Sequence, residues 1–229
     1  DLTTGTYVSV YMSEPCCPPV GESVSDFDVC ARVAEKLGPE YYDAYTGKLT
    51  EAKGGMILAE SFREKFDCNR PVALITVGTP TNDEYDQRVS NLLDQSENQI
   101  IRIPTQRYSE LAQYYQCADI SVFAKQCSLS FYDAQACGLP VVLEDIPVNQ
   151  TRIKHHNGRT FASGDFKALR NAICSFINMS DGEFQLYQEN AVRNVRENYD
   201  YKMIAQRYLS VLEEEVESFK SKRSGGNKK

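Results

Sequence analysis

Short apolar runs alternate with longer amphipathic stretches along most of the chain. The apolar runs predict strands over residues 41–46, 71–77, 99–103, 119–124 and 139–143, and a shorter strand around Thr160–Phe161. Elsewhere, apolar residues recur every three or four positions, which predicts helices over residues 28–37, 51–66, 84–93, 108–117 and 130–137. Short apolar strands that alternate with helices are typical of an α/β fold with a parallel sheet and helices on both faces.

The chain divides into three segments. Residues 1–24, where prolines surround Cys16 and Cys17, predict an irregular linker. The alternating pattern defines one domain over residues 25–215, in which three closing helices follow the last strand over residues 165–177, 182–197 and 202–219. No strand is predicted between these helices, so they pack on the sheet or cross to another part of the molecule. Residues 216–229 combine a helix end with a basic tail that we expect to be flexible.

Composition argues against several classes of protein. With 229 residues the chain can form one well-packed core, and its formal net charge of −7 argues against nucleic acid as a partner. No apolar run approaches the ~20 residues of a membrane span. The first residues, Asp1–Gly5, lack the basic and apolar regions of a signal peptide and resemble a cut inside a longer protein. The basic tail leaves a weak peripheral contact with an anionic membrane surface as an alternative to a solvated end.

The cysteines and histidines do not predict a metal site. No C-x-x-C pair is present, and Cys117, Cys137 and Cys174 lie in apolar, helix-like stretches where we expect small buried residues. His155 and His156 are adjacent, have no Cys or carboxylate at metal-ligand spacing, and are predicted to be surface residues. We expect a reduced chain in the cytoplasm, with any peripheral contact at the inner membrane face.

The loop after the first strand suits an anion. In parallel sheets, ligands bind at the carboxyl ends of the strands. Here Gly47 and Lys48 are followed by Lys53 across a turn that opens a helix. Ammonium groups and helix N-terminal amides both stabilise anions, so the turn suits a pyrophosphate; the alternative is a pair of solvated lysines. The absence of G-x-x-x-x-G-K-[ST] and G-x-G-x-x-G argues against a Walker site and a dinucleotide cofactor.

A second polar loop follows the strand at residues 119–124. It runs through Lys125 into a short helix that carries Asp133 on its first turn. The carboxylate of Asp133 could accept hydrogen bonds from the two hydroxyls of a ribose. Alternatively, Ser130 and Asp133 form a capping-box-like pattern that binds helix amides.

These two segments, in this order, resemble the C-terminal domain of retaining GT-B glycosyltransferases of glycosyltransferase family 4 (group 1). The most specific block is Asp133-Ala134-Gln135-Ala136-Cys137-Gly138-Leu139-Pro140-Val141-Val142. Weaker matches follow the family's order at Gly47-Lys48-Leu49, Lys53-Gly54, Val77-Gly78, Ile103-Pro104, Ala118-Asp119, Asn157-Gly158-Arg159 and Gly164-Asp165. The similarity covers residues 25–215 and implies a Rossmann-like sheet that forms one half of a GT-B fold.

The resemblance also implies a role for each matching position. Lys48 and Lys53 match the basic residues that hold the donor pyrophosphate, and Asp133, shorter than the family's Glu, matches the ribose-binding position. Lys125 stands where the family has another Glu, which faces the donor sugar; Lys125 could bind a sugar carboxylate, bind a phosphate, or have no role. The remaining substrate-binding positions implied for sugar, phosphate and base are Gly47, Gln126, Cys127, Ser128, Leu129, Ser130, and the loop from Ile103 through Thr105 to Arg107.

The implied activity is transfer of a hexosyl unit, with retention at the anomeric carbon, from a nucleotide-diphospho-sugar. The acceptor, a glycan or lipid-linked sugar, and the family's catalytic His are expected on an N-terminal domain outside this chain, so the chain alone is expected to be inactive. No cofactor and no metal are expected, and the pathway class is polysaccharide or glycoconjugate biosynthesis. Two alternatives are a non-catalytic nucleotide-sugar-binding module and another GT-B enzyme, such as a sugar-nucleotide epimerase.

Overall fold

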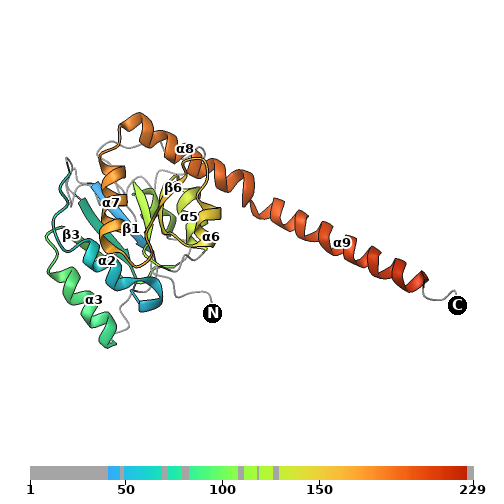
Figure 1. The fold of residues 1–229 in the computed structure, drawn as a ribbon, viewed down its shortest axis with the longest axis horizontal. Coiled ribbons are helices and arrows are strands. Elements are labelled where there is room, and N and C mark those ends of the chain that lie inside the picture. Colours follow the sequence, from blue (N-terminus) through green and yellow to red (C-terminus); the bar gives the residue numbers. More distant parts are fainter. Residues whose placement is uncertain are drawn as a thin grey trace.

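The computed structural model describes most of the chain after residue 40 (Figure 1). The described ranges are 41–46, 49–68, 72–78, 83–107, 111–117, 119–125 and 129–225. The predicted linker and the predicted helix over residues 28–37 lie outside these ranges. So do five of the expected site positions, namely Gly47, Lys48, Gln126, Cys127 and Ser128.

The described chain forms a parallel sheet of six strands, as the alternating pattern predicted. The strands are β1 (Tyr41–Thr46), β2 (Val72–Val77), β3 (Gln99–Ile103), β4 (Ile120–Phe123), β5 (Val141–Glu144) and β6 (Gly158–Phe161). Their order across the sheet is β3-β2-β1-β4-β5-β6, and every neighbouring pair is parallel. This is the order of a doubly wound Rossmann fold, in which the first half of the chain builds one side of the sheet and the second half builds the other.

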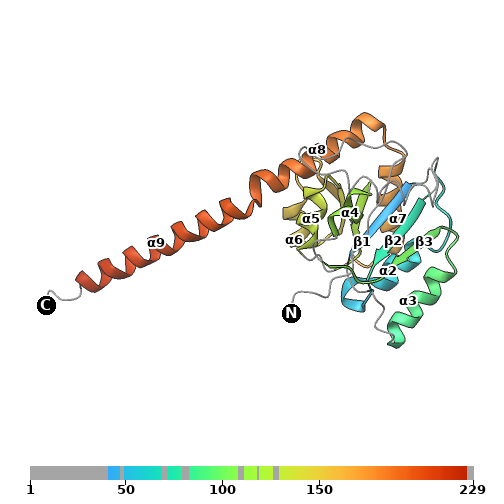
Figure 2. The ribbon, with the colours of Figure 1, turned by 180° about the vertical axis from the view of Figure 1, so that it is seen from behind.

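Helices cover both faces of the sheet (Figures 1 and 2). They are the 3₁₀ turn η1 (Glu51–Lys53), α2 (Gly55–Ser61), α3 (Glu84–Asp94), α4 (Leu111–Gln116), α5 (Ser130–Ala136), α6 (Pro147–Arg152), α7 (Phe166–Ile177), α8 (Asp181–Asn198) and α9 (Tyr201–Gly225). Helices α2, α3 and α7 lie on one face, and α4 and α5 lie on the other. Every side chain of β2, β4 and β5 is buried, which explains why these strands are apolar without alternation.

The predicted helix over residues 51–66 is wrong in extent, because the structure divides it. Gly54 adopts a left-handed conformation between η1 and α2, and α2 ends at Ser61. Beyond that point side chains from distant elements bind the carbonyls that a longer helix would use. The Asn98 amide donates to the Phe62 oxygen at 2.7 Å, and the Arg170 guanidinium donates to the Ser61 oxygen at 3.0 Å. The amphipathic pattern therefore continues into a loop that tertiary contacts hold open.

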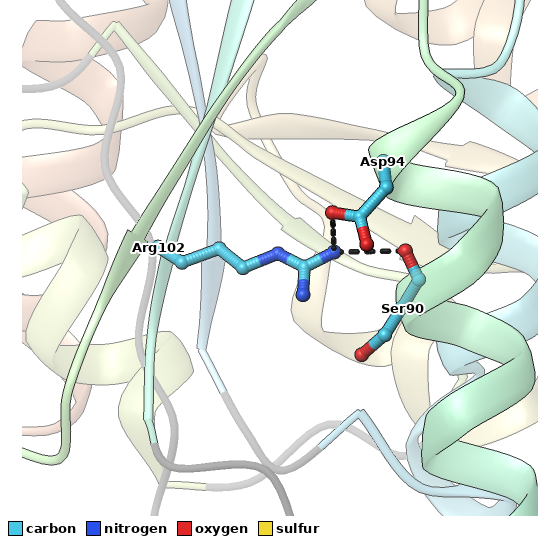
Figure 3. Close-up of polar contacts among 3 residues, drawn as sticks. All are labelled: Ser90, Asp94 and Arg102. Carbon is cyan, nitrogen blue, oxygen red and sulfur yellow. Dashed lines mark hydrogen bonds and ion pairs between the residues drawn. The ribbon is translucent and has the colours of Figure 1, made fainter.

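The Arg102 side chain of β3 contacts α3 at the outer edge of the sheet (Figure 3). Its guanidinium donates to the Ser90 carbonyl at 2.9 Å and contacts the Asp94 carboxylate at 3.1 Å. Both partners lie in the C-terminal half of α3, where a cation is favourable beside the helix carbonyls. This contact fixes the two elements that precede the predicted base-binding loop.

Two helices differ from the sequence prediction. Helix α6 was not predicted; Pro147 at its start suits a first helical turn, but its six residues are too few to show a periodic pattern. Helix α9 continues to Gly225 rather than ending near residue 219, and it extends away from the domain (Figures 1 and 2). No helix in the described ranges combines the length and apolar character that crossing a membrane requires.

The cysteines match their prediction only in part. Cys117 is buried, whereas Cys137 and Cys174 are half-buried, and the thiols of all three are reduced. Burial is the main reason that the pKa of the Cys174 thiol is raised.

Candidate functional site

The sheet has a topological switch point between β1 and β4. β1 and β4 are neighbours in the sheet, with Tyr45 opposite Val122. The strand that follows β1 in the chain, β2, lies on the far side of β1, and the strand that follows β4, β5, lies on the far side of β4. The chain therefore leaves these two strands for helices on opposite faces of the sheet, and the crevice outside such a pair of carboxyl ends is where doubly wound folds bind ligands. Both polar loops singled out in the sequence begin here.

The turn Thr50–Gly54, which leads into α2, is closed by backbone hydrogen bonds and ends at a glycine. The Lys53 amide donates to the Thr50 carbonyl at 3.0 Å, and the Gly54 amide donates to the Glu51 carbonyl at 3.1 Å. Gly54 has φ +76°, which lies in the left-handed region that favours glycine. Lys53 itself is half-buried and immediately precedes this glycine.

Gly54 brings the turn into direct contact with the loop after β4. A Cβ atom placed on Gly54 would lie 2.9 Å from the Ala124 carbonyl carbon and 2.9 Å from the Lys125 Cβ. Only a residue without a side chain allows this approach. The contact places Lys53 and Lys125, which are far apart in the sequence, on adjacent loops at the switch point, with Lys125 exposed and Ala124 fully buried.

Backbone amides of this turn are already bound within the protein. The Gly55 amide donates to the Thr50 carbonyl at 3.1 Å, and the Met56 amide donates to the Tyr85 hydroxyl at 3.0 Å. Burial is the main reason that the pKa of Tyr85 is raised. The expected contribution of helix-end amides to anion binding is therefore not supported for residues 53–56, and positive charge at this turn comes from side chains.

Helix α5 presents the expected ribose-binding carboxylate. Asp133 is half-buried on the first turn of α5, and α5 follows the loop that begins at Lys125. Leu129, which is 73% exposed, occupies the N-cap position and makes no side-chain capping bond, while Ser130 is buried inside the helix. Ser130 therefore does not occupy the N-cap position that the capping-box alternative gave it. A capping box does form elsewhere, between Ser180 and Glu183 at the start of α8.

The expected base-binding loop lies at the same edge of the sheet but farther out. Ile103 ends β3, and β2 separates β3 from β1. The Gly78 amide donates to the Ile103 carbonyl at 2.7 Å, which joins the ends of β2 and β3. Thr105 and Arg107 are exposed in the loop that follows. The structure thus brings Lys53, Lys125 and Asp133 to the switch point and leaves the Ile103–Arg107 loop on its flank.

Sequence reasoning missed one buried acid at this edge. Glu144 ends β5, beside β4, and only 5% of its surface is exposed. Its carboxylate accepts a 2.6 Å hydrogen bond from the Ser163 hydroxyl, and its carbonyl accepts from the Asn149 amide at 2.8 Å. The sequence did offer a signal for this residue, because Glu144 is a charged residue at the end of the otherwise apolar run Val141–Leu143. The carboxylate joins the end of β5 to the loop after β6, on the β5–β6 side of the switch point.

The histidines lie at the opposite edge of the sheet. His155 and His156 are exposed in the turn that precedes β6, with φ values of +52° and +60°. The His156 ring nitrogen lies 3.3 Å from the Tyr187 hydroxyl. Within the described ranges, no group of three or more His, Cys, Asp or Glu side chains is arranged to hold a metal ion.

Comparison with known protein families shows which family this chain belongs to. The family described as "Glycosyl transferases group 1" matches residues 43–179, which is more than half of the chain. The chain therefore belongs to the group 1 glycosyl transferases. No curated protein matches the sequence.

Solved structures share the fold at low sequence identity. Sucrose-phosphate synthase from Thermosynechococcus elongatus matches with a TM-score of 0.68 and 18% identity, over 87% of this chain and 52% of that chain. HepE from Anabaena, in complex with UDP-glucose, matches with a TM-score of 0.69 and 20% identity, over 84% of this chain and 54% of that chain.

A third match is the C-terminal domain of a group 1 family glycosyl transferase from Francisella tularensis. It has a TM-score of 0.60 and 16% identity, over 78% of this chain and 95% of that domain. The chain thus has the fold of the C-terminal half of a GT-B glycosyltransferase and spans about half the length of the two longer structures.

Proposed function

We propose that this chain is the donor-binding domain of a retaining glycosyltransferase, which holds a nucleotide-diphospho-sugar for transfer of its hexosyl unit. The observation that carries the proposal is the contact of Gly54 with Ala124 and Lys125. This contact joins the lysine-bearing turn to the loop that leads into Asp133, at the switch point where a ligand is expected. The family match and the UDP-glucose bound to HepE support a nucleotide sugar as the ligand class.

In this proposal each side chain has a separate task. Lys48 and Lys53 bind the diphosphate, and they stabilise the charge that develops on its oxygen as the bond to the anomeric carbon breaks. Asp133 accepts hydrogen bonds from the ribose hydroxyls, and the loop Ile103–Arg107 contacts the base. Lys125, on the loop that touches Gly54, faces the sugar or its phosphates. The remaining sugar and phosphate contacts come from the segment between Lys125 and Asp133.

The proposal needs an acceptor on the other side of the crevice. We propose that the acceptor, a glycan or lipid-linked sugar, is bound by a separate N-terminal domain. The length of the two longer structural matches, of which this chain covers about half, supports this proposal. Neither a metal nor a cofactor takes part, because lysine ammonium groups balance the charge of the diphosphate. We propose the cytoplasm as the location of the reaction, and polysaccharide or glycoconjugate biosynthesis as its pathway class.

One observation favours a second candidate function. At Lys125 the family pattern has a Glu, which accepts hydrogen bonds from sugar hydroxyls, whereas a Lys only donates. A site changed in this way could bind a nucleotide sugar without transferring it. The second candidate is therefore a non-catalytic nucleotide-sugar-binding module, with the same ligand and the same lysines.

Calorimetry of the purified chain tests the shared core of both functions. UDP, ADP and GDP are titrated first, followed by UDP-glucose and other nucleotide sugars. We expect Lys53→Ala to weaken binding of the preferred nucleoside diphosphate by about 1.5–3 kcal/mol, roughly 10- to 150-fold in Kd. Lys154→Ala, which removes an exposed lysine at the opposite edge of the sheet, is the matched control and should bind like the parent. Equal affinities for the parent and Lys53→Ala would refute the assignment.

A further inference from the structure

Tyr85 links helix α3 to the turn that carries Lys53. Its hydroxyl accepts a hydrogen bond from the Met56 amide at 3.0 Å, and the two residues are 29 positions apart in the sequence. Met56 is the second residue of α2, and the turn directly before α2 contains Lys53. Helices α2 and α3 lie side by side on one face of the sheet (Figures 1 and 2). The bond therefore connects the proposed diphosphate-binding turn to a distant segment of the chain.

Helix α3 holds the Tyr85 ring in a fixed position. The Asp83 side chain caps the helix, where it accepts from the Asp86 amide at 2.8 Å. Tyr85, Val89 and Leu93 recur at intervals of four residues, so they lie on one face of the helix. Val89 and Leu93 are buried, and the half-buried Tyr85 packs against the same core. The core therefore fixes the position of the ring, and with it the position of the hydroxyl.

The turn needs such an attachment because two glycines follow Lys53. Gly54 and Gly55 separate Lys53 from the first side chain of α2, and glycine restricts the backbone less than any other residue. The amides of these three residues donate to the carbonyls of Thr50 and Glu51. These local bonds give the turn its shape. They do not fix where the turn lies relative to the rest of the domain, because donors and acceptors belong to the same short segment.

Contacts from distant segments fix where the turn lies. Gly54 approaches the loop after β4 so closely that a Cβ atom would lie 2.9 Å from atoms of Ala124 and Lys125. This steric contact limits how near the turn can come to that loop, but it does not hold the turn in place. The hydrogen bond to Tyr85 is attractive and directional, and it comes from α3. The close contact and the hydrogen bond together define the position of the turn.

The position of Met56 leaves its amide without an acceptor in its own helix. The first four amides of an α-helix lack an intrahelical carbonyl, and Met56 is the second residue of α2. The Tyr85 hydroxyl supplies the acceptor, whereas a phenylalanine would keep the ring and have no group that accepts. Leu58, which is fully buried, would still hold α2 against the core. Tyr85→Phe should therefore loosen the turn without unfolding the helix.

We infer that Tyr85 is a positioning residue for the donor site, which acts through Lys53 by holding the turn at Met56. The inference rests on the proposed function, because it takes from it the role of Lys53 in binding the diphosphate. Tyr85 does not contact the ligand itself. It reduces the conformational freedom that the lysine-bearing turn would otherwise lose on binding, and ordering a site in advance in this way raises its affinity.

A double-mutant cycle measured by calorimetry separates this role from a general structural one. The ligand is whichever of UDP, ADP and GDP the parent chain binds most tightly. We expect Tyr85→Phe to raise its Kd roughly 3- to 10-fold. In a Lys53→Ala background the same substitution should change Kd less than ~2-fold, because residues that act through one group are not additive. An equal loss in both backgrounds would overturn the inference, since the effect would then not depend on Lys53.

Tyr187→Phe is the matched control. Tyr187 is also half-buried, and its hydroxyl also has a neighbour, the His156 ring nitrogen at 3.3 Å. It belongs to α8 and lies beside the turn before β6, at the opposite edge of the sheet. The control removes the same hydroxyl group and should bind the nucleoside diphosphate like the parent. Denaturant unfolding of each variant checks that the domain remains folded.

Amide hydrogen exchange tests the bond itself. In Tyr85→Phe the Met56 amide should exchange at least ~10-fold faster than in the parent, while the amides of β4 keep their rates. An unchanged rate at Met56 would overturn the inference. So would a Tyr85→Phe variant that binds like the parent while Lys53→Ala binds more weakly. If Lys53→Ala itself binds like the parent, the proposed diphosphate site is refuted first, and the inference falls with it.

Discussion

Gly54 connects the two loops of the site through its missing side chain. It combines a positive φ of +76° with backbone contacts too close for a Cβ atom. Gly164 has almost the same backbone conformation, with φ +74°, but a Cβ there would meet nothing within 4 Å. The two glycines therefore separate the effect of backbone conformation from the effect of the contact between the loops.

We expect Gly54→Ala to be more damaging than Gly164→Ala. Both substitutions place an alanine in the left-handed region, which costs about 1–2 kcal/mol. Gly54→Ala should lose a further ~1–3 kcal/mol, because the new methyl group forces Ala124 and Lys125 away. Denaturant unfolding measures both losses, and calorimetry with the preferred nucleoside diphosphate should show weaker binding for Gly54→Ala alone. Equal losses of stability would contradict the importance of the contact.

Lys125 decides between a phosphate and a sugar carboxylate as its ligand. We expect Lys125→Ala to weaken binding of the donor by about 1–3 kcal/mol. If the ammonium group binds phosphate, affinity for the bare nucleoside diphosphate should fall with it, and most at low salt, where ion pairs are least screened. If it binds a carboxylate, only a nucleotide uronic acid should lose affinity. Lys154→Ala is again the control, and unchanged binding of both ligands would leave Lys125 without a role in donor binding.

At the scale of elements, Arg170 joins α7 to the loop that follows α2. Its guanidinium donates to the Ser61 carbonyl at 3.0 Å and to the Glu64 carbonyl at 2.7 Å, and it also donates to the Lys65 carbonyl. The same group lies 4.1 Å from the centre of the Phe66 ring. Helix α2 follows the lysine-bearing turn directly and begins at Gly55. The hydrogen bonds from Arg170 hold the C-terminal end of α2, and they therefore help to position the turn at its other end.

We expect Arg170→Lys to lower the free energy of unfolding by about 2–3 kcal/mol. Lysine keeps the charge but cannot reproduce the planar group that donates to several carbonyls and stacks on an aromatic ring. Denaturant unfolding measures the loss. Lys167→Met, at an exposed position of the same helix, should change stability by less than ~0.5 kcal/mol. An Arg170→Lys variant as stable as the parent would show that the charge alone is sufficient.

At the scale of the whole molecule, the proposed function assigns this chain one side of the crevice in which transfer takes place. It spans about half the length of sucrose-phosphate synthase and HepE and 95% of an isolated C-terminal domain. Transfer of a sugar requires donor and acceptor to be held in a fixed geometry with water excluded. Of the proposed donor groups, Lys53, Lys125 and Asp133 lie in the described ranges, after the carboxyl ends of β1 and β4.

We therefore expect the purified chain to bind a nucleotide sugar but to transfer almost none of it. The measurement follows release of nucleoside diphosphate in the presence of acceptor sugars, using a preparation whose binding has been verified by calorimetry. Binding on the same sample is the control, because it excludes misfolding as the cause of a low rate. Turnover in the ordinary enzymatic range of ~1–10³ s⁻¹ would contradict the expectation.

The sequence by itself determined the fold class and the location of the polar loops. The strands Tyr41–Thr46 and Gln99–Ile103 were predicted with the bounds that the structure has, because an apolar run between turn residues is a local signal. Lys53, Lys125 and Asp133 were recognisable because each lies in the loop after a predicted strand or on the first turn of the helix that follows it. Parallel strands end at one edge of the sheet, so this edge could be predicted as well.

Only the tertiary structure decided how these segments meet. Strand order, and with it the contact of Gly54 with Lys125, depends on pairing between distant segments, which no local periodicity records. The end of α2 depends on bonds from Asn98 and Arg170, and the Met56 amide is bound by Tyr85 rather than left for an anion. The exposure of the large apolar side chains of α9 is likewise a tertiary fact, because the same amphipathic pattern would suit a helix packed on the sheet. Local sequence sets which conformations are favourable, and contacts between distant residues select among them.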